Sequence, residues 1–174
     1  MEKVLMVDVA KPEDAAGIVR VRHETWLATY PNAEAGVTEE DIFAKNFQSE
    51  DQIKRWKRGI EDETGTRKIW VAKNDAGEVV GYGQGKKGDA ENEIWGLYVL
   101  PTYRGKGLGS KLMKSVVDWL GNEKPITLSV ATYSSSAVEL YKRFGFIEVD
   151  EPGAGPVFAS GATATSIKMV RPKK

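Results

Sequence analysis

Three glycines and several cations gather in the segment Leu-Pro-Thr-Tyr-Arg-Gly-Lys-Gly-Leu-Gly-Ser over residues 100–110. A β-type run ends just before this segment and an amphipathic helical pattern follows it, so the segment joins a strand to a helix. Glycines let a backbone turn tightly and approach a ligand closely, and the first N–H groups of a helix lack partners within it. Because the helix dipole also favours an anion there, the segment predicts a pyrophosphate-binding site.

The lysines around this helix start support the same prediction. Lys106, Lys111 and Lys114 stand at or near the positive end of the helix dipole. A cation is unfavourable there by about 0.3–1 kcal/mol. Such a local conflict is expected where a bound anion supplies the opposite charge. A glycine-rich loop with solvated lysines is the alternative interpretation.

A second glycine pattern, Gly-Gln-Gly-Lys-Lys-Gly over residues 83–88, matches the dinucleotide-binding fingerprint G-x-G-x-x-G letter for letter. The residues that follow lead into another β-type run and not into a helix. Without a helix N-terminus the fingerprint cannot bind a pyrophosphate in the usual way, so we interpret the segment as a hairpin connection. The chain contains no G-x-x-x-x-G-K-[ST] sequence, so a P-loop is not supported.

The elements that must position the loop follow from hydrophobic periodicity and from capping and turn residues. Helices are predicted over about 12–28, 38–57, 110–120 and 134–144. The second of them begins at a capping box formed by Thr38 and Asp41. Strands are predicted over 4–9, 67–73, 79–84, 93–100, 126–130, 146–149 and 165–170. This order predicts one α/β domain, residues 1–174 with a core over 2–172, built around a mixed sheet.

The composition excludes several kinds of site and partner. The 174 residues carry 25 basic and 25 acidic side chains, a balance that does not favour nucleic-acid binding through bulk charge. With no cysteine and a single histidine, His23, disulfides, thiolate chemistry and a multi-histidine metal site are excluded. The sequence contains no apolar run long enough for a membrane helix and no signal-peptide pattern. We expect a soluble cytoplasmic protein with no metal, nucleic-acid or membrane partner.

The segment over 104–109 resembles the pyrophosphate signature Gln/Arg-x-x-Gly-x-Gly/Ala of the GNAT family of N-acetyltransferases, matched by Arg104, Gly107 and Gly109. Residues 134–146, Ser-Ser-Ser-Ala-Val-Glu-Leu-Tyr-Lys-Arg-Phe-Gly-Phe, are similar to the family's Ala-x-x-Leu-Tyr-x-x-x-Gly-Phe segment. The resemblance is strongest over 93–149. It implies the acyl-CoA N-acyltransferase fold, a mixed and mostly antiparallel sheet flanked by helices, and acetyl-CoA as donor.

The resemblance also implies roles for residues at matching positions. Main-chain groups of Leu97, Tyr98 and Val99 would bind the pantetheine arm as an added strand would. The pyrophosphate would be held by the loop and helix start, that is by Arg104, Gly105, Lys106, Gly107, Leu108, Gly109 and Ser110. Ala137 and Tyr141 match the second segment. Ser134 stands where the family often has asparagine, and its hydroxyl would cap the helix or reach the pantetheine through water.

Acetyl transfer from a thioester to an amine requires a proton for the departing thiolate and the loss of one from the amine. Tyr141 occupies the family's acid position, with packing beside Leu140 and Phe144 as the alternative. Glu93 is the candidate base, acting through a water, because it lies at the start of the strand that would carry the pantetheine contacts. Period two places Glu93 and Trp95 on the same face of that strand. A solvated surface carboxylate is the alternative, and the pocket and its water could replace a dedicated base.

The acceptor pocket is expected between the first two helices and the loop joining them. Trp26 and Tyr30, with Trp95, would form a wall that binds an amine as a cation, or else the edge of the core. The Trp-x-x-Thr-Tyr pattern over 26–30 is similar to that of some polyamine-acetylating relatives. His23 could be a base or a partly buried side chain.

These observations predict direct transfer of an acetyl group to a primary amine of a small molecule, either a polyamine or an amino-acid-like amine. Two alternatives stay open. A protein or peptide N-acetyltransferase would need a long open groove across the sheet. A catalytically silent acyl-CoA-binding module would not need Tyr141. The sequence is compatible with a homodimer but leaves both the oligomeric state and the acceptor undetermined.

Overall fold

A computed structural model describes residues 6–174 of the chain, so the predicted strand residues Val4 and Leu5 lie outside the described part. The longer helices are α1 (Ala15–Thr29), α2 (Glu39–Ala44), α3 (Glu50–Ile60), α4 (Leu108–Leu120) and α5 (Ser135–Arg143), with short 3-10 turns at Pro12–Asp14 and Pro101–Tyr103. The strands are β1 (Met6–Val9), β2 (Arg67–Lys73), β3 (Val79–Lys86), β4 (Asn92–Val99), β5 (Ile126–Ala131), β6 (Ile147–Pro152) and β7 (Ser166–Arg171).

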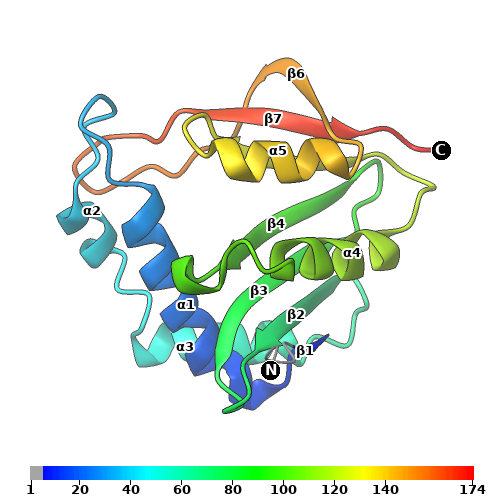
Figure 1. Ribbon diagram of the computed structural model, residues 1–174, viewed down its shortest axis with the longest axis horizontal. Helices are drawn as coiled ribbons and strands as arrows, with labels where there is room; N and C mark the ends of the chain where they lie inside the picture. Colours follow the sequence, from blue (N-terminus) through cyan, green and yellow to red (C-terminus); the bar gives the residue numbers. More distant parts are fainter. Residues whose placement is uncertain (1–5) are drawn as a thin grey trace.

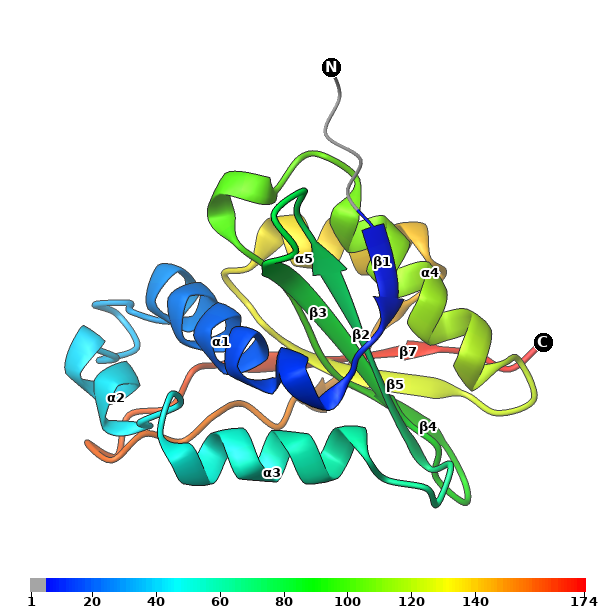
Figure 2. The same ribbon diagram turned by 90° about the horizontal axis from the view of Figure 1, so that it is seen from below.

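The strands form a seven-stranded sheet in the order β1-β2-β3-β4-β5-β7-β6. Every neighbouring pair is antiparallel except β4 with β5, which is parallel. Helices α4 and α5 lie in front of the sheet in Figure 1, and α1 and α3 lie on its other side, as the turned view in Figure 2 shows. The predicted mixed, mostly antiparallel sheet flanked by helices is therefore confirmed. None of the helices over residues 6–174 is long and apolar enough to cross a membrane.

The single helix predicted over 38–57 is wrong, because the chain forms α2 and α3 with a break between them. The capping box at the start of α2 is present: Thr38 N donates to Asp41 Oδ2 at 3.0 Å. Asn46 then adopts a left-handed conformation with φ 48°, which ends the helical path. Ser49 begins α3 by accepting a hydrogen bond from Gln52 N at 3.3 Å. The break turns Phe47 into the core, where it is 4% exposed.

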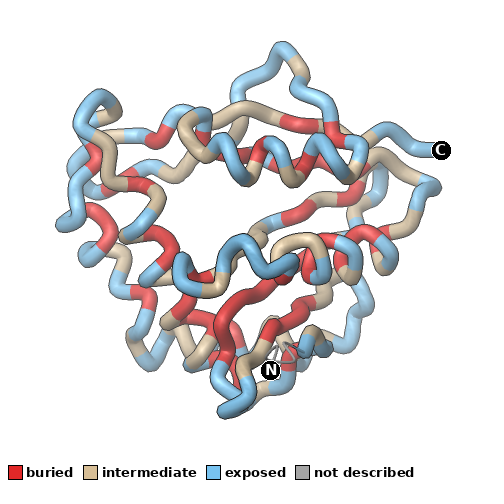
Figure 3. Tube along the Cα trace, viewed as in Figure 1, coloured by how far each residue is buried: buried red, intermediate tan, exposed pale blue. Residues whose placement is uncertain are grey.

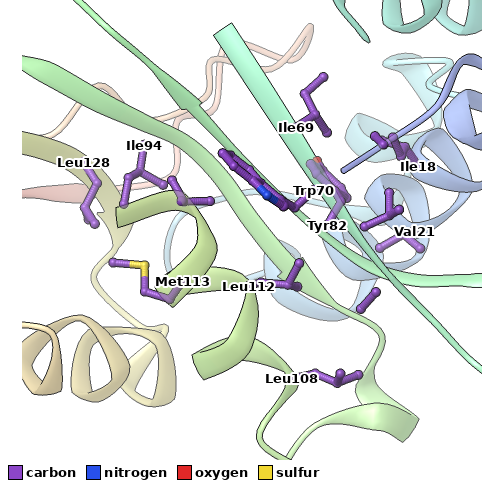
Figure 4. Packing of buried hydrophobic residues seen from close by; sticks show 14 of the residues in the cluster. Ile18, Val21, Ile69, Trp70, Tyr82, Ile94, Leu108, Leu112, Met113 and Leu128 are labelled. Atoms are coloured by element: carbon purple, nitrogen blue, oxygen red, sulfur yellow. The ribbon is translucent and has the colours of Figure 1, made fainter. Parts of the chain in front are cut away.

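Two glycines of the second glycine pattern lie within β3 and let α4 approach the sheet closely. A Cβ added to Gly83 would lie 3.2 Å from Val116 Cγ2, and one added to Gly85 would lie 3.1 Å from Val116 Cγ1. Gly88 follows the strand, in the connection to β4. The predicted hairpin connection is therefore right only for residues 87–88, because residues 83–86 belong to β3, where the glycines serve helix–sheet packing. Figure 4 shows Leu112 and Met113 of α4 in the core that results.

The opposite face of β3 carries Tyr82, which packs against α3 and β4. Its ring centroid lies 5.2 Å from that of Trp56 and 5.4 Å from that of Tyr98. Ile18 and Val21 of α1 are fully buried on this side of the sheet. Figure 3 shows the buried positions following β3 and the inner faces of α1 and α4. Both helix layers therefore pack against β3, one on each of its faces.

A smaller apolar cluster joins the end of α1 to the loop between β6 and β7. Its buried members include Trp26, Tyr30, Phe47 and Phe158. Two polar contacts hold the same loop against α2 and the residue that follows it. Lys45 Nζ donates to the carbonyl oxygen of Val157 at 2.8 Å, and Ser160 N donates to Asp41 Oδ1 at 3.3 Å. This end of the molecule is therefore fastened by packing and hydrogen bonds together.

The buried phenol of Tyr82 generates a prediction about stability at high pH. Burial raises the pKa of Tyr82 above its ordinary value of 10.0. Above that pH the unfolded chain loses the phenolic proton while the folded chain keeps it, so the free energy of unfolding should fall as pH rises. Urea denaturation at pH 9 and pH 11 measures this. Tyr82→Phe should make this fall smaller by about 1.4 kcal/mol over the whole interval, an average slope of about 0.7 kcal/mol per pH unit. An unchanged slope would contradict the assignment.

Candidate active site

A cavity opens where β4 and β5 separate. The two strands pair only at Asn92 with Ile126 and at Glu93 with Thr127. The register of β3 with β4 then shifts, leaving Trp95 as an extra residue on β4, and such a bulge bends and twists a strand. Beyond it lies a cavity of about 780 Å³ lined by β4, β5, the first turns of α4 and α5, and the end of α1. That volume is typical of a site for a sizeable small molecule.

Main-chain hydrogen bonding leaves one edge of β4 free beside this cavity. On the β3 side, Leu100 N donates to Val80 O at 2.9 Å, and bonded and non-bonded pairs alternate along an antiparallel ladder. Tyr98 therefore bonds to β3 through its main chain, whereas Leu97 and Val99 direct their main-chain groups toward the gap. The predicted pantetheine contacts of Leu97 and Val99 require groups that β3 does not use, and this register provides them. Tyr98 instead contributes its side chain to the cavity wall.

The first turn of α4 faces the same cavity without a capping side chain. Gly107 is the N-cap residue with φ 78°, a left-handed conformation that favours glycine, and Gly105 has φ 75°. The first helical hydrogen bond runs from Lys111 N to Gly107 O at 3.1 Å, so the N–H groups of residues 108–110 have no helical acceptor. Gly105, Gly107, Gly109 and Ser110 line the cavity. This arrangement can bind an anion with main-chain donors and the helix dipole.

The remaining residues predicted at this loop differ in whether they line the cavity. Arg104 lines the cavity, and its Nε donates to the carbonyl oxygen of Val99 at 3.0 Å. Leu108 is buried in the core, so only its main chain is available. Lys106 lies 5.3 Å from the Tyr103 ring centroid and is not part of the cavity wall.

The lysines around the start of α4 support the predicted anion site only in part. Lys111 is exposed on the first turn of α4 and does not line the cavity. Lys114 forms an ion pair with Asp118 one turn further along the helix. Its positive charge is therefore balanced within α4 and does not require a bound anion.

Tyr141 presents its side chain to the cavity from α5. The residue is 6% exposed, and burial raises the pKa of its hydroxyl, with Tyr98 nearby adding to the effect. The phenol therefore stays protonated at neutral pH and can act as a proton donor. It also packs against Phe146, with ring centroids 6.0 Å apart. The position is compatible with both the acid and the packing interpretations of the sequence.

Further tyrosines surround this hydroxyl. Tyr30, Tyr98 and Tyr133 all line the cavity, as the prediction for Tyr30 anticipated. Tyr133 donates its hydroxyl to the carbonyl oxygen of Tyr30 at 3.1 Å. Burial raises the pKa of Tyr30, and the neighbouring Tyr98 contributes to the shift. Sequence reasoning missed Tyr133, although its place directly after β5 and before the hydroxyl-rich start of α5 was a usable signal.

Trp26 does not line the cavity, contrary to the prediction of an amine-binding wall. It is 7% exposed within the smaller core cluster. The Arg22 guanidinium already stacks on its ring, with Cζ 5.1 Å from the centroid. The spacing of Trp26 on α1 suits the core because the loop before β7 covers that face of the helix.

The remaining predicted side chains lie at or beside the cavity. Trp95 is 45% exposed and lines it, but Glu93 does not, and Glu93 Oε2 instead accepts a hydrogen bond from Trp95 Nε1 at 2.9 Å. Ser134 and Ala137 line the cavity from the start of α5. Ser134 is the N-cap residue, yet its side chain makes no capping hydrogen bond. Its hydroxyl therefore remains available to the cavity. Over residues 6–174 there is no cluster of carboxylate or imidazole groups suited to a metal ion.

The chain is similar to known proteins in ways that agree with this geometry. It is 34% identical over 101 residues to an uncharacterized protein of Mycobacterium leprae, covering 55% of this chain and 27% of that one. It is 37% identical over 57 residues to the thialysine N-epsilon-acetyltransferase of Mus musculus, covering 32% and 34% of the two chains. The chain thus matches only about a quarter to a third of the length of these curated relatives.

The fold resembles that of the PaiA N-acetyltransferase of Thermoplasma acidophilum, solved in complex with coenzyme A. The TM-score is 0.71 with 18% sequence identity, and the similarity covers 98% of this chain and 99% of that one. The profile of the acetyltransferase (GNAT) family matches residues 22–146. That range contains the free edge of β4, the uncapped start of α4 and Tyr141. The chain therefore belongs to the acetyltransferase (GNAT) family.

Proposed function

We propose that this protein is an acetyl-CoA-dependent N-acetyltransferase that transfers the acetyl group directly to a primary amine of a small molecule. The observation that carries the proposal is one cavity containing three features: main-chain anion donors at α4, a free strand edge on β4, and the protonated hydroxyl of Tyr141. Membership of the GNAT family supports the same reaction.

The donor would lie along β4 and the start of α4. N–H groups of residues 108–110 would bind its diphosphate, since they point at the cavity and lack helical acceptors. Main-chain groups of Leu97 and the N–H of Val99 would bind the amides of the pantetheine arm, as in strand addition, since the Val99 carbonyl oxygen already accepts from Arg104 Nε. The hydroxyls of Ser110 and Ser134 face the same space. The thioester that acetyl-CoA supplies is activated for attack by an amine.

Tyr141 would donate its proton to the departing sulfur. An acid in this place must be neutral before the transfer, and burial of Tyr141 ensures that it is. Tyr98, which also borders the cavity, helps to raise the pKa of the same hydroxyl. Phenolate formation is unfavourable at this buried position, so solvent would restore the proton after transfer.

Glu93 would remove the amine proton through a water. The carboxylate lies behind Trp95, to which it is hydrogen-bonded, and Trp95 forms part of the cavity wall. One water molecule between the Glu93 carboxylate and the acceptor amine would be the shortest path for the proton. If Glu93 only orients the indole, water in the cavity would take the proton instead.

A small acceptor is favoured over a protein or peptide by the contacts near the end of α1. A peptide would need an open groove, and the loop before β7 is fastened to the α2 region by Lys45 and Asp41. The presence of Tyr141 in the cavity favours an enzyme over a silent acyl-CoA-binding module. The expected cytoplasmic location and homodimer remain predictions.

Gly107→Glu should abolish acetyl-CoA binding, because it places a carboxylate at the N-cap beside the N–H groups that would hold the diphosphate. Isothermal titration calorimetry with acetyl-CoA measures the loss. Gly77→Glu is a matched control, since Gly77 also has φ 78° with open space around it but lies in the turn between β2 and β3. Equal affinity in the two variants would refute the diphosphate site.

Tyr141→Phe should lower kcat by about 100-fold or more, the contribution typical of a positioned proton donor, while the Kd for acetyl-CoA stays nearly constant. Stopped-time assays of CoA thiol release, with calorimetry alongside, separate the two effects. Unchanged turnover would reduce Tyr141 to a packing residue. Absence of turnover in the parent protein, with acetyl-CoA still bound, would favour the silent module.

Glu93→Gln tests the proposed water-mediated base. The amide keeps an oxygen that can accept the Trp95 hydrogen bond but cannot take a proton at neutral pH. We expect kcat to fall and the acidic limb of the kcat–pH profile to change shape. If kcat falls with an unchanged profile, Glu93 only positions Trp95.

A further inference from the structure

Arg22 of α1 and Arg67 of β2 contribute positive charge on the face of the sheet opposite α4, where neither serves the proposed donor site. Arg22 is half-buried, and its Cζ lies 4.5 Å from the ring centroid of Phe47 and 5.1 Å from that of Trp26. The two rings hold the guanidinium in place by stacking, which does not use its N–H donors. Arg22 is therefore oriented by packing.

Arg67 is oriented by hydrogen bonds. Its Nε and Nη2 donate to Gln84 Oε1 at 3.0 and 2.7 Å, and Gln84 is itself 8% exposed. Gly59 of α3 leaves room for the guanidinium, because a Cβ there would lie 2.3 Å from Arg67 Nη1. Burial lowers the pKa of Arg67, and Arg22 and Arg55 are near enough to lower it further, against the opposite effects of Asp62 and Tyr82.

Neither arginine has an acidic partner among residues 6–174, where no carboxylate oxygen lies within 4.0 Å of either guanidinium. The nearby carboxylates are engaged elsewhere: Asp62 accepts hydrogen bonds from Thr64, and Glu93 accepts one from Trp95. Half-buried like charges without partners are costly. Such a conflict is expected where a ligand supplies the opposite charge.

Trp95 connects Arg67, and Lys86 beside it, to the cavity. The ring lines the cavity, and Arg67 Cζ lies 5.7 Å and Lys86 Nζ 4.7 Å from its centroid. On the other side, Arg22 stands seven residues before Thr29, which lines the cavity. Seven residues of helix correspond to about 10 Å. An acceptor with an anionic group at the arginines and its amine in the cavity would therefore need a chain of several bonds between the two groups.

We propose that the acceptor is an amine with an anionic group, a carboxylate or a phosphate, at the far end of a short chain, and that Arg22 and Arg67 bind this group. Guanidinium donors fit both anions in a bidentate manner. The inference rests on the proposed acetyltransferase function and selects an amino-acid-like acceptor over a polyamine. A polyamine would bring positive charge toward Arg22, Arg67 and Lys86.

Acceptors that differ in one group provide the test. Initial rates of CoA thiol release are measured with acetyl-CoA and 6-aminohexanoate, 6-aminohexyl phosphate, hexylamine, L-lysine or cadaverine. Cadaverine is L-lysine without its carboxylate. We expect kcat/KM to be at least about tenfold higher for an anionic acceptor than for its uncharged or decarboxylated counterpart, as for a charge-assisted hydrogen bond. The carboxylate and phosphate arms distinguish the two anions.

Arg22→Met keeps the aliphatic contact with Trp26 and Phe47 but removes the charge. It should lower kcat/KM for the preferred anionic acceptor about tenfold or more, mainly through KM, and leave hexylamine or cadaverine nearly unchanged. Arg58→Met, an exposed arginine on α3, is the control and should change neither rate. Arg67→Lys should give a smaller loss than Arg22→Met. Thermal unfolding and acetyl-CoA affinity confirm that each variant folds.

The outcomes separate the two proposals. Rates for hexylamine and cadaverine equal to or above those of their anionic counterparts would overturn the anionic acceptor while leaving the acetyltransferase intact. A preference for the anionic acceptors that survives in Arg22→Met would overturn the assignment of Arg22. Failure to acetylate every amine, with acetyl-CoA bound, would overturn both the acceptor proposal and the proposed function.

Discussion

The separation of β4 from β5 after two parallel residue pairs is the constraint on which the rest of the site depends. A fully paired parallel sheet would satisfy the main chain of Leu97 and Val99 with β5, and no cavity could form between the strands. The bulge at Trp95 bends β4 away while β5 remains paired with β7 along its whole length. Gly83 and Gly85 then allow α4 to lie close to β3, so that its first turn reaches the opening.

The cavity relies on neutral hydroxyls and backbone dipoles more than on charged side chains. Tyr30 and Tyr141 are both buried enough to keep their protons at high pH, and the groups proposed to bind the diphosphate are main-chain N–H groups. Oriented neutral dipoles avoid the large desolvation cost that buried ions incur. Lys106 and Lys114 lie outside this space, where Lys106 stacks on Tyr103 and Lys114 pairs with Asp118, while Arg104 lines the cavity with its Nε bonded to the Val99 carbonyl oxygen.

Features that depend on neighbouring residues were predictable from the sequence. The strand–glycine–helix unit around Gly107 is local, and so is the capping box at Thr38, whereas the packing of α4 on Gly83 and Gly85 was not predicted because it depends on a contact distant in sequence. Side-chain direction near the bulge was not predictable, because one extra residue on β4 changes which faces Glu93 and Trp95 share with the residues beyond. The break at Asn46 was also missed, since helical spacing continues across it. Arg22 and Arg67 lie far apart in the sequence, and only the folded sheet brings their charges together.

The two sides of the sheet differ in the kind of group they offer. Around the start of α4 the candidate donor site is formed largely by main-chain atoms, which many sequences can provide once glycines permit the turn. On the α1 and α3 side the available groups are side chains: Arg22 is held by aromatic rings and Arg67 by Gln84, with Trp95 between Arg67 and the cavity. A motif of glycines can therefore identify the donor while remaining silent about the acceptor. If Arg22 and Arg67 bind the acceptor as proposed, its specificity resides in side-chain charge, which the glycine motif does not encode.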